Sequence, residues 1–360
     1  MWDPFGMAKV AEPGQGITYE ELALATRNRG MPLEGLRYDV TPVGMHYLLV
    51  HFDVPDVDAA SWRLQIGGRV RRPLSLGLDD LLARPARTLA VTLECAGNGR
   101  ARLAPRPISQ PWLVEAIGTA EWTGTPLADV LDEAGVDPAA IELVFTGADR
   151  GVQGDIEHDY QRALTIAEAT RPEVLLAYAM NGRPLEPQHG APLRLLVPGW
   201  YGMTSVKWLA RIDAVTEPFT GFQQADAYRY QQREDDPGQP VSRIRVRALM
   251  IPPGIPDFFT RRRLVERGPV RLRGRAWCGT AAVARVEVAV DGVWRDAALD
   301  APIGPWAWRG WSFTWDAAPG DHVLTCRATD ADGNVQPIDQ PWNLQGMGNN
   351  RVQEVEVTVR

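Results

Sequence analysis

Cysteine is scarce in this chain, and its few cysteines stand far apart. The sequence contains only Cys95, Cys278 and Cys326. Three widely spaced cysteines exclude a disulfide scaffold and a zinc site built from cysteine pairs. There is no cysteine cluster for an iron–sulfur centre and no CxxCH motif for haem attachment. The chain therefore brings no iron–sulfur or c-type haem centre of its own.

Long apolar runs and an excess of positive charge are also missing. No stretch reaches 18 apolar residues, so no membrane span is predicted. Residues 1–16 lack a basic start followed by an apolar run, which argues against a Sec or twin-arginine signal. We expect a cytoplasmic location, or a periplasmic one if a leader has been removed. The formal net charge of −7 argues against a nucleic-acid partner.

One segment departs from this acidic balance. Residues 242–275 contain ten arginines but only two acidic residues, Asp257 and Glu266. Such a cluster is most often a solvated or inter-domain surface. The functional alternative is a docking patch for an acidic redox partner, attracted by the field of the arginines.

Glycine and proline are plentiful, and the first 240 residues predict a mixed α+β domain. With 34 glycines and 29 prolines in 360 residues, we expect two loop-rich domains. Thr18 and Glu21 form a capping-box pattern before a short helix, and Gly135 ends an amphipathic helix that begins near residue 125. Apolar segments predict strands at residues 46–55, 62–70, 88–94, 141–151 and 192–200.

The pattern changes near residues 237–240. Beyond them, several short segments alternate apolar and polar residues at period two, separated by turn signals such as DG and PGD. This pattern predicts an immunoglobulin-like β-sandwich. We therefore expect an N-terminal extension at 1–40, a first domain at 41–238 and a sandwich at 239–360.

The sharpest local motif is TLECAGNGR at residues 92–100. A predicted buried strand delivers Cys95 into a loop with Gly97 and Gly99, which allow a close approach of the backbone to a bulky group. Arg100 adds a nearby positive charge. This setting favours a thiolate, which is a nucleophile or a soft-metal ligand. A free cysteine is also commonly a small buried hydrophobe, and the segment alone leaves both interpretations open.

This motif resembles the molybdenum-binding loop of the sulfite oxidase family. Three further segments, in the same order as in that family, extend the resemblance to about residues 40–360: WLVEAIGTAEWTGTPLADVL, EVLLAYAMNGRPLEPQHGAPLRLLVPGWYGMTSVKWL and PWNLQGMG. The resemblance implies a sulfite oxidase-type molybdopterin-binding domain followed by an immunoglobulin-like dimerisation domain, and therefore a homodimer. It also implies one molybdenum–molybdopterin cofactor, with Cys95 as the protein ligand to the metal.

The resemblance also assigns residues that hold the pterin. These are His51, Asp149, His189, Arg194, Ser205 and Lys207. Arginine and lysine suit phosphate, because arginine grips it with a planar fork and lysine acts as a point charge. Taken singly, His51 is also typical of a core histidine, Arg194 of a paired strand charge and Lys207 of a surface residue. Their joint spacing favours the cofactor.

The predicted substrate pocket departs from the family pattern. The resemblance assigns Arg100, Trp112 and Tyr228 to the pocket, with Tyr230 as an alternative tyrosine. Two further family arginines correspond to Leu49 and Gln345, and a serine of the pterin-binding stretch corresponds to Ala163. Losing two charge-assisted contacts, at about 1.5–3 kcal/mol each, would weaken the binding of a dianion such as sulfite.

Three functions therefore remain open. The first is a sulfite dehydrogenase-like enzyme with an external electron acceptor and no haem. The second is an oxo-transferase for a less anionic substrate, such as an S- or N-oxide. The third is a non-enzymatic cofactor carrier or interaction module, which would need no ordered pocket around Cys95.

Overall fold

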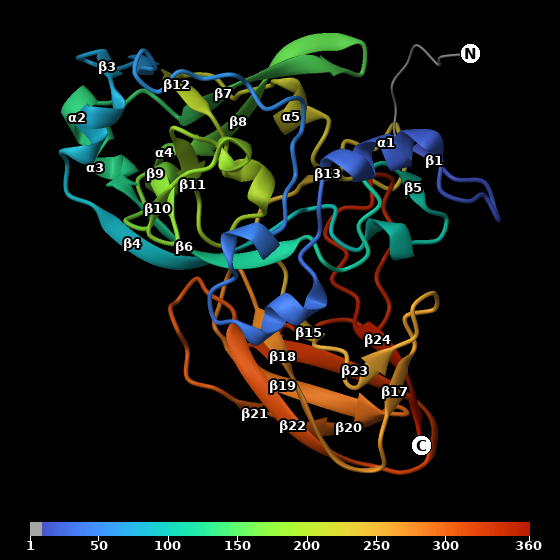
Figure 1. The fold of residues 1–360 in the computed structure, drawn as a ribbon. Helices are drawn as coiled ribbons and strands as arrows, with labels where there is room; N and C mark the ends of the chain where they lie inside the picture. The colour runs from blue at the N-terminus through green and yellow to red at the C-terminus, as the bar shows by residue number, and fades with distance from the viewer. Residues whose placement is uncertain (1–8) are drawn as a thin grey trace.

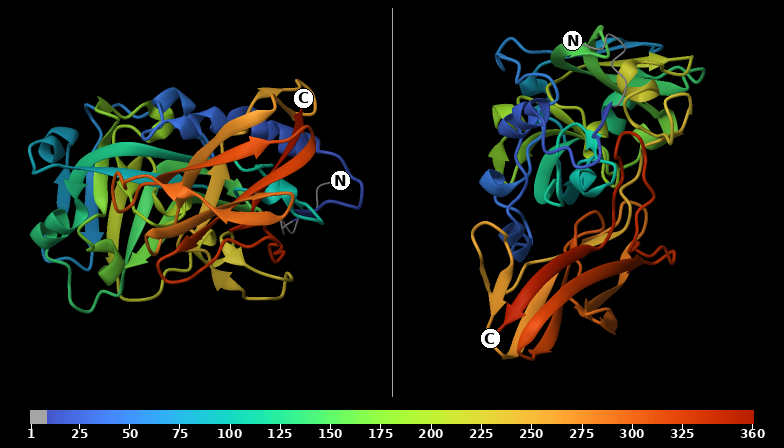
Figure 2. Two further views of the ribbon diagram at one scale, coloured as in Figure 1. Left: turned by 90° about the horizontal axis from the view of Figure 1, so that it is seen from below. Right: turned by 90° about the vertical axis from the view of Figure 1, so that its right-hand side faces the viewer.

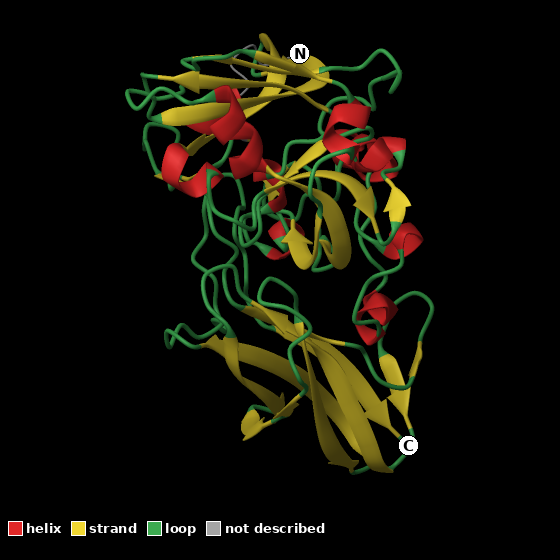
Figure 3. Ribbon diagram, turned by 90° about the vertical axis from the view of Figure 1, so that its left-hand side faces the viewer, coloured by secondary structure: helices red, strands yellow, loops and turns green. Residues whose placement is uncertain are grey.

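The computed structural model describes residues 9–360, which form two strand-rich parts (Figure 1). We call residues 9–240 the mixed part and the strands from residue 247 onward the sandwich. Figure 3 shows that most helices lie in the mixed part, around and between its sheets. The α+β prediction is therefore confirmed. No helix within residues 9–360 combines the length and apolar character that a membrane crossing requires.

Two five-stranded sheets form the centre of the mixed part. The first has the order β3-β2-β12-β7-β8, in which only β2 and β12 are parallel. The second has the antiparallel order β10-β9-β6-β4, with β11 also on β9. The bounds are β2 (Leu64–Gly68), β3 (Leu74–Leu76), β4 (Arg87–Glu94), β6 (Ile117–Pro126), β7 (Glu142–Gln153), β8 (Ile156–Thr165), β9 (Leu175–Met180), β10 (Arg183–Pro184), β11 (Arg194–Leu196) and β12 (Leu209–Val215).

The helices of the mixed part are short, and α1 and α3 begin or end where the sequence predicts. Thr18 accepts a hydrogen bond from the Glu21 N–H, and the Glu21 carboxylate accepts one from the Thr18 N–H, which completes the capping box. Gly135, at φ +67°, caps α3. The bounds are α1 (Tyr19–Arg27), α2 (Leu78–Leu82), α3 (Leu127–Ala134), α4 (Ile166–Ala169) and α5 (Phe222–Ala225). Two small ribbons pair β1 (Lys9–Val10) with β5 (Pro107–Ile108) and β13 (Arg229–Tyr230) with β14 (Gln239–Pro240).

The strand predicted at residues 46–55 is wrong. This segment is irregular apart from one bridge between Leu48 and Arg29. Side chains satisfy its backbone instead of a neighbouring strand: the Val50 N–H donates to Asn28 Oδ1 at 2.7 Å, and Lys207 Nζ donates to the Leu49 carbonyl at 2.7 Å. Buried backbone groups need partners, but those partners need not be another strand.

The sandwich packs a four-stranded sheet, β15-β18-β22-β21, against a six-stranded sheet, β16-β17-β24-β23-β19-β20. Its core contains alternate residues of both sheets, such as Val286, Val288 and Leu324 of the six-stranded sheet and Trp311 of the four-stranded sheet. The predicted immunoglobulin-like sandwich is confirmed. The bounds are β15 (Arg247–Met250), β16 (Ile255–Pro256), β17 (Arg263–Val265), β18 (Gly268–Trp277), β19 (Val283–Val290), β20 (Val293–Asp296), β21 (Ala298–Leu299), β22 (Arg309–Ala317), β23 (Gly320–Asp330) and β24 (Gln353–Val359).

Segments near the start and near the end of the described chain contact both parts. In the expected N-terminal extension, residues 1–8 lie outside the described residues, and residues 33–37 form a 3-10 helix whose Leu36 carbonyl accepts a hydrogen bond from Arg275 of the sandwich. The segment before β24 rises back into the mixed part (Figure 2, right), where the Gly348 N–H donates to the Ala96 carbonyl. The division of the chain at residue 238 stays a prediction, because segments on either side of it contact both parts.

The arginine-rich segment 242–275 is not one surface. Arg247, Arg263 and Arg275 are buried and bind carbonyl or carboxylate oxygens. Arg243, in the segment between the two parts, pairs with Glu168 of the mixed part. The arginines that remain exposed are Arg261, Arg267, Arg271 and Arg273. The inter-domain interpretation therefore accounts for a large share of the cluster.

Glu94 is the central contact between the two parts. It ends β4, directly before Cys95, and its side chain is 2% exposed. Its carboxylate accepts hydrogen bonds from Arg247 at 2.7 Å, from Trp277 Nε1 at 2.8 Å and from Asn98 Nδ2 at 2.9 Å. Two of these donors come from the sandwich, so the residue that positions Cys95 is held by the second domain.

We expect Glu94→Gln to lower the free energy of unfolding by about 3–5 kcal/mol, because it leaves the buried Arg247 charge unpaired. Chemical denaturation followed by tryptophan fluorescence measures the loss. The surface pair Arg351–Glu354 provides a matched control, and Glu354→Gln should change stability by less than about 1 kcal/mol. Adding Arg247→Met to Glu94→Gln should restore part of the loss. Equal losses for the buried and surface pairs would contradict this account.

Candidate functional site

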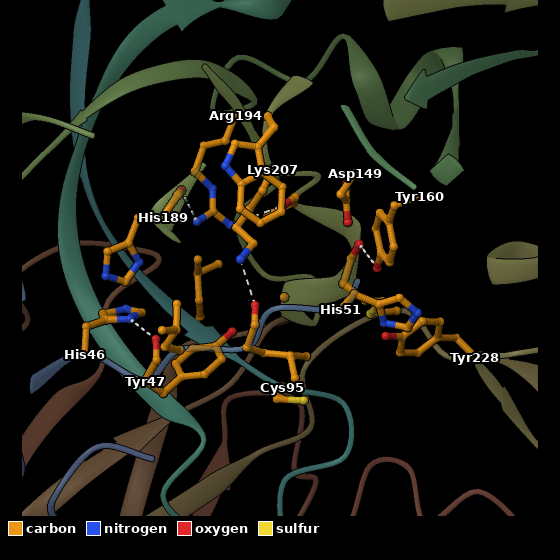
Figure 4. Close-up of a pocket in the computed structure, with 17 residues that line it drawn as sticks. His46, Tyr47, His51, Cys95, Asp149, Tyr160, His189, Arg194, Lys207 and Tyr228 are labelled. Atoms are coloured by element: carbon orange, nitrogen blue, oxygen red, sulfur yellow. Dashed lines mark hydrogen bonds between the residues drawn. The ribbon is translucent and has the colours of Figure 1, made fainter. Parts of the chain in front are cut away.

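Cys95 lies at the end of β4, on the wall of a cavity in the mixed part (Figure 4). Its side chain is buried, and burial raises the pKa of its thiol. The Arg100 charge, a hydrogen bond from the Gly97 backbone and the Trp112 indole all act in the opposite direction and favour the thiolate. The setting suits a sulfur that is ionised only when a cation or metal binds it.

The glycines of the Cys95 loop serve the protein's own packing. A Cβ at Gly97 would lie 2.6 Å from the Arg100 guanidinium, and one at Gly99 would lie 3.0 Å from Asn349 Nδ2. Gly99 also has φ +92°, which favours glycine. The space that the sequence suggests for a bulky ligand is therefore taken up, on these sides, by side chains of the chain itself.

All six residues predicted to hold the pterin line the same cavity as Cys95. They come from separate places in the sequence: His51 from the irregular segment, Asp149 from β7, His189 from a 3-10 helix (Pro187–His189), Arg194 from β11, and Ser205 and Lys207 from the turn before β12. Figure 4 shows His189 and Arg194 at one end and His51, Tyr160 and Tyr228 at the other, with Cys95 between them along the lower wall. The structure therefore brings these residues together as predicted, and their roles remain predictions.

Two cations in this cavity have no carboxylate partner. No Asp or Glu oxygen of residues 9–360 lies within 4 Å of the side-chain nitrogens of Arg194 or Lys207, whose hydrogen bonds go to backbone carbonyls. Arg194 Nε is buried without a described partner. Burial lowers the pKa of Arg194 to about 10 and the pKa of Lys207 to about 7. Buried, unpaired cations are unfavourable unless an anion joins them.

Histidines extend this basic wall. The ring centroids of His46 and His189 lie 5.8 Å apart, edge to face. Burial lowers the pKa of His46 to about 4 and that of His189 to about 3, so both are neutral at physiological pH while no anion is bound. His46 Nε2 has no described hydrogen-bond partner. Together with Arg194 and Lys207, these rings fit a phosphate-bearing ligand.

The far end of the cavity is held by a network of glutamines. His51 Nε2 lies 2.8 Å from Gln153 Oε1 and 3.1 Å from Gln223 Nε2. Burial lowers the pKa of His51 to about 4. The Ser205 hydroxyl accepts a hydrogen bond from the Val197 N–H, so this side chain also fixes the backbone beside Arg194.

The predicted substrate residues divide into two groups. Tyr228 lines the cavity, whereas Tyr230 lies under Arg245, whose Cζ is 4.4 Å from its ring centroid. Arg100 and Trp112 are buried beneath the Cys95 loop and are not on the cavity wall. The Arg100 guanidinium donates to the Gln345 and Gln110 carbonyls and to Met347 Sδ.

The two positions at which family arginines are absent also differ. Leu49 is on the cavity wall. The Gln345 side chain lies elsewhere and donates to the Asp226 carbonyl and Gln231 Oε1. Ala163 is buried in β8. An apolar wall at Leu49 therefore replaces a charge in the cavity itself.

Sequence reasoning missed several residues of the cavity wall, among them His46, Tyr47 and Tyr160. Tyr47 stacks on His46 at 5.1 Å between ring centroids, and Tyr160 donates to the Met203 carbonyl. The irregular path of residues 46–51 brings His46 into the wall, which the strand prediction concealed. The sequence gives only a weak indication that Tyr160 faces the interior, namely its position two residues before Arg162 on the same face of β8.

The fold and this cavity, with one cysteine and unpaired basic groups, define a molybdopterin-binding oxidoreductase, and comparisons with known proteins agree. The oxidoreductase molybdopterin binding domain family matches residues 51–223, and the Mo-co oxidoreductase dimerisation domain family matches residues 243–360. The chain belongs to the sulfite oxidase family of molybdopterin-dependent oxidoreductases.

Individual relatives differ in length and in the reaction that they are named for. Mitochondrial sulfite oxidase of Mus musculus is 34% identical over 384 aligned positions, which cover 99% of this chain and 68% of that protein. The Homo sapiens enzyme is 35% identical, and the alignment covers 89% of this chain and 62% of that protein. Nitrate reductase [NADH] 1 of Oryza sativa subsp. japonica is 31% identical, and the alignment covers 89% of this chain and 38% of that protein. Among solved structures, the sulfane dehydrogenase SoxCD of Paracoccus pantotrophus superposes with a TM-score of 0.81 at 25% identity, covering 98% of this chain and 88% of that one.

Asp149 gives the cavity a measurable pH dependence. Burial raises the pKa of its carboxyl to about 7, although the Lys207 charge acts in the opposite direction, and Oδ1 has no described partner. Because the pKa of Asp149 is higher in the folded chain than in the unfolded chain, the contribution of this carboxyl to the free energy of unfolding is fully present below about pH 4. It is lost as the pH rises through 7.

We therefore expect Asp149→Asn to stabilise the cofactor-free protein more at pH 8 than at pH 5, by roughly 2–3 kcal/mol. Denaturant titration of protein made in a host without molybdopterin synthesis measures this difference. Asp129→Asn changes an exposed carboxyl of α3 and serves as the control. If the gain in the free energy of unfolding caused by Asp149→Asn is the same at pH 5 and pH 8, Asp149 is not a titrating, desolvated group.

Proposed function

We propose that this protein holds molybdenum on one molybdopterin in the described cavity and catalyses oxygen-atom transfer to or from a small substrate. The observation that carries the proposal is that Cys95 and the unpaired cations Arg194 and Lys207 line one cavity. When bound, the cofactor supplies the redox step in which an oxygen atom moves between metal and substrate.

The chain's own residues have separate tasks in this proposal. Cys95 is the protein ligand to the metal. Arg194, Lys207 and His189 bind the pterin's phosphate, and Asp149 and His51 contact its ring system. Cys95 is the single cysteine of the cavity wall, and residues 9–360 contain no group of three or more metal-binding His, Cys, Asp or Glu side chains. A metal bound by Cys95 would therefore need further ligands from a cofactor, and molybdopterin would supply them.

Sulfite oxidation is the first candidate reaction, by similarity to relatives named as sulfite oxidases. Arg100, Trp112 and Tyr228 would belong to its substrate site. A less anionic substrate, such as an S- or N-oxide, is the alternative, favoured by the apolar wall at Leu49. In either case we propose an external electron partner, no haem on this chain and a homodimer formed through the dimerisation domain.

We expect Cys95→Ser to abolish turnover while the protein retains its pterin. Serine removes the soft sulfur donor but leaves the phosphate-binding groups at Arg194 and Lys207 in place. Turnover with an artificial electron acceptor, pterin fluorescence after extraction and the molybdenum spectrum are measured together. Cys278→Ser, at a partly exposed cysteine of the sandwich, is the matched control. Wild-type activity with an unchanged spectrum in the Cys95 variant would rule out the ligand assignment.

Sulfite should be a poor substrate of the wild type, with a high KM. The variant Leu49→Arg should lower that KM by about tenfold, because it adds a positive charge to the cavity wall. Such a contact contributes about 1.5–3 kcal/mol, less the penalty for burying a guanidinium. Gln345→Arg should have a smaller effect, since its side chain lies off the wall. Steady-state kinetics of both single variants and the double variant test this, alongside an S-oxide and an N-oxide. A low wild-type KM for sulfite would contradict the expectation.

A further inference from the structure

Arg162 is a buried cation that none of the assignments above uses. It lies on β8, its relative exposure is 2%, and no Asp or Glu oxygen of the described chain lies within 4 Å of its guanidinium. One hydrogen bond, from Nη1 to the Gln223 carbonyl, is formed, and Nε has no described partner. Since arginine keeps its charge in proteins, this charge is buried without compensation.

Arg162 stands directly behind the end of the cavity that lies away from Arg194 and His189. It shares a face of β8 with Tyr160, two residues earlier, which lines the cavity. Its Cζ lies 5.4 Å from the ring centroid of Tyr228, which lines the same end. Through Gln223, which lies 3.1 Å from His51, it touches a third residue of that wall.

Tyr228 therefore lies between two buried arginines of different character. The charges of Arg162 and Arg100 both act to lower the pKa of its phenol, although burial raises that pKa to about 12. Arg100 is bound by two carbonyls and a sulfur, whereas Arg162 retains an unpartnered N–H. Arg162 thus retains a buried N–H without a described partner, whereas the described hydrogen bonds of Arg100 use all three of its side-chain nitrogens.

We propose that Arg162 determines the substrate specificity of the site. From behind Tyr228, it supplies positive potential to an anionic substrate and fixes the Tyr228 ring, which offsets only part of the charge missing at Leu49. Because it acts through Tyr228, it is a positioning residue and not a catalytic one. This inference rests on the proposed oxo-transfer function of the same cavity.

The test compares the holoenzyme in four forms: wild type, Arg162→Met, Arg162→Lys and Arg263→Met. Arg263 is a matched control, because it is also buried, binds only carbonyls and lies in the sandwich. Each form is assayed for molybdenum and pterin content, for calorimetric binding of sulfate as an unreactive dianion, and for kcat and KM with sulfite and with uncharged dimethyl sulfoxide.

We expect Arg162→Met to weaken sulfate binding and raise the KM for sulfite by about tenfold, because a buried charge acts on a nearby anion through a medium of low dielectric constant even without direct contact. The kcat for sulfite, the KM for dimethyl sulfoxide and the cofactor content should stay near wild type, as should all values for Arg263→Met. Arg162→Lys should restore much of the sulfate binding. Equal shifts for both substrates, loss of cofactor, or a wild type that does not bind sulfate would overturn the proposal.

Salt dependence keeps the proposal testable if Arg162→Met does not fold. A buried charge is screened less than an exposed one, so wild-type sulfate affinity should fall only slightly with added sodium chloride. A steep fall would assign the binding to exposed arginines and refute the role of Arg162. A fully loaded wild type that converts neither substrate would refute the proposed function, while sulfate binding and its dependence on Arg162 would still decide this inference.

Discussion

The cavity depends on one buried interaction, the contact of Glu94 with Arg247 and Trp277. Glu94 ends the strand that delivers Cys95, and both partners come from the sandwich. A carboxylate and a guanidinium out of water are stable only together, so the position of the cysteine is tied to the docking of a domain that contributes no residue to the cavity wall. The sandwich is therefore part of the site's support, whatever its role in dimerisation.

A second constraint is the imbalance of charge inside the mixed part. Arg194 and Arg162 are buried and Lys207 is half-buried, all without carboxylate partners, and burial also lowers the pKa values of His46 and His189. A folded protein tolerates such a set when an anion belongs there. Arg194 and Lys207 line the cavity, whereas Arg162 lies against Tyr228 outside the lining. In our proposals the first two serve the phosphate of a cofactor and the third serves an anionic substrate.

Much of this could be predicted from sequence, because the information was local. The capping box of α1, the alternation of the sandwich strands and the spacing of His189, Arg194 and Lys207 are all visible in short segments. What escaped depends on contacts between distant segments. Residues 46–55 look like a strand, but Asn28 and Lys207 satisfy their backbone. Arg162 looks like an ordinary strand residue until its lack of a carboxylate partner is known.

The segment before β24 has a consequence for how the protein is made. Arg100, just after Cys95, donates to the carbonyl of a residue 245 positions later, and Gly348 and Asn349 bind the loop at Ala96 and Gly99. During translation the mixed part emerges from the ribosome long before these partners exist. The cysteine loop therefore cannot reach its final form before residues 345–349 have emerged and docked against it.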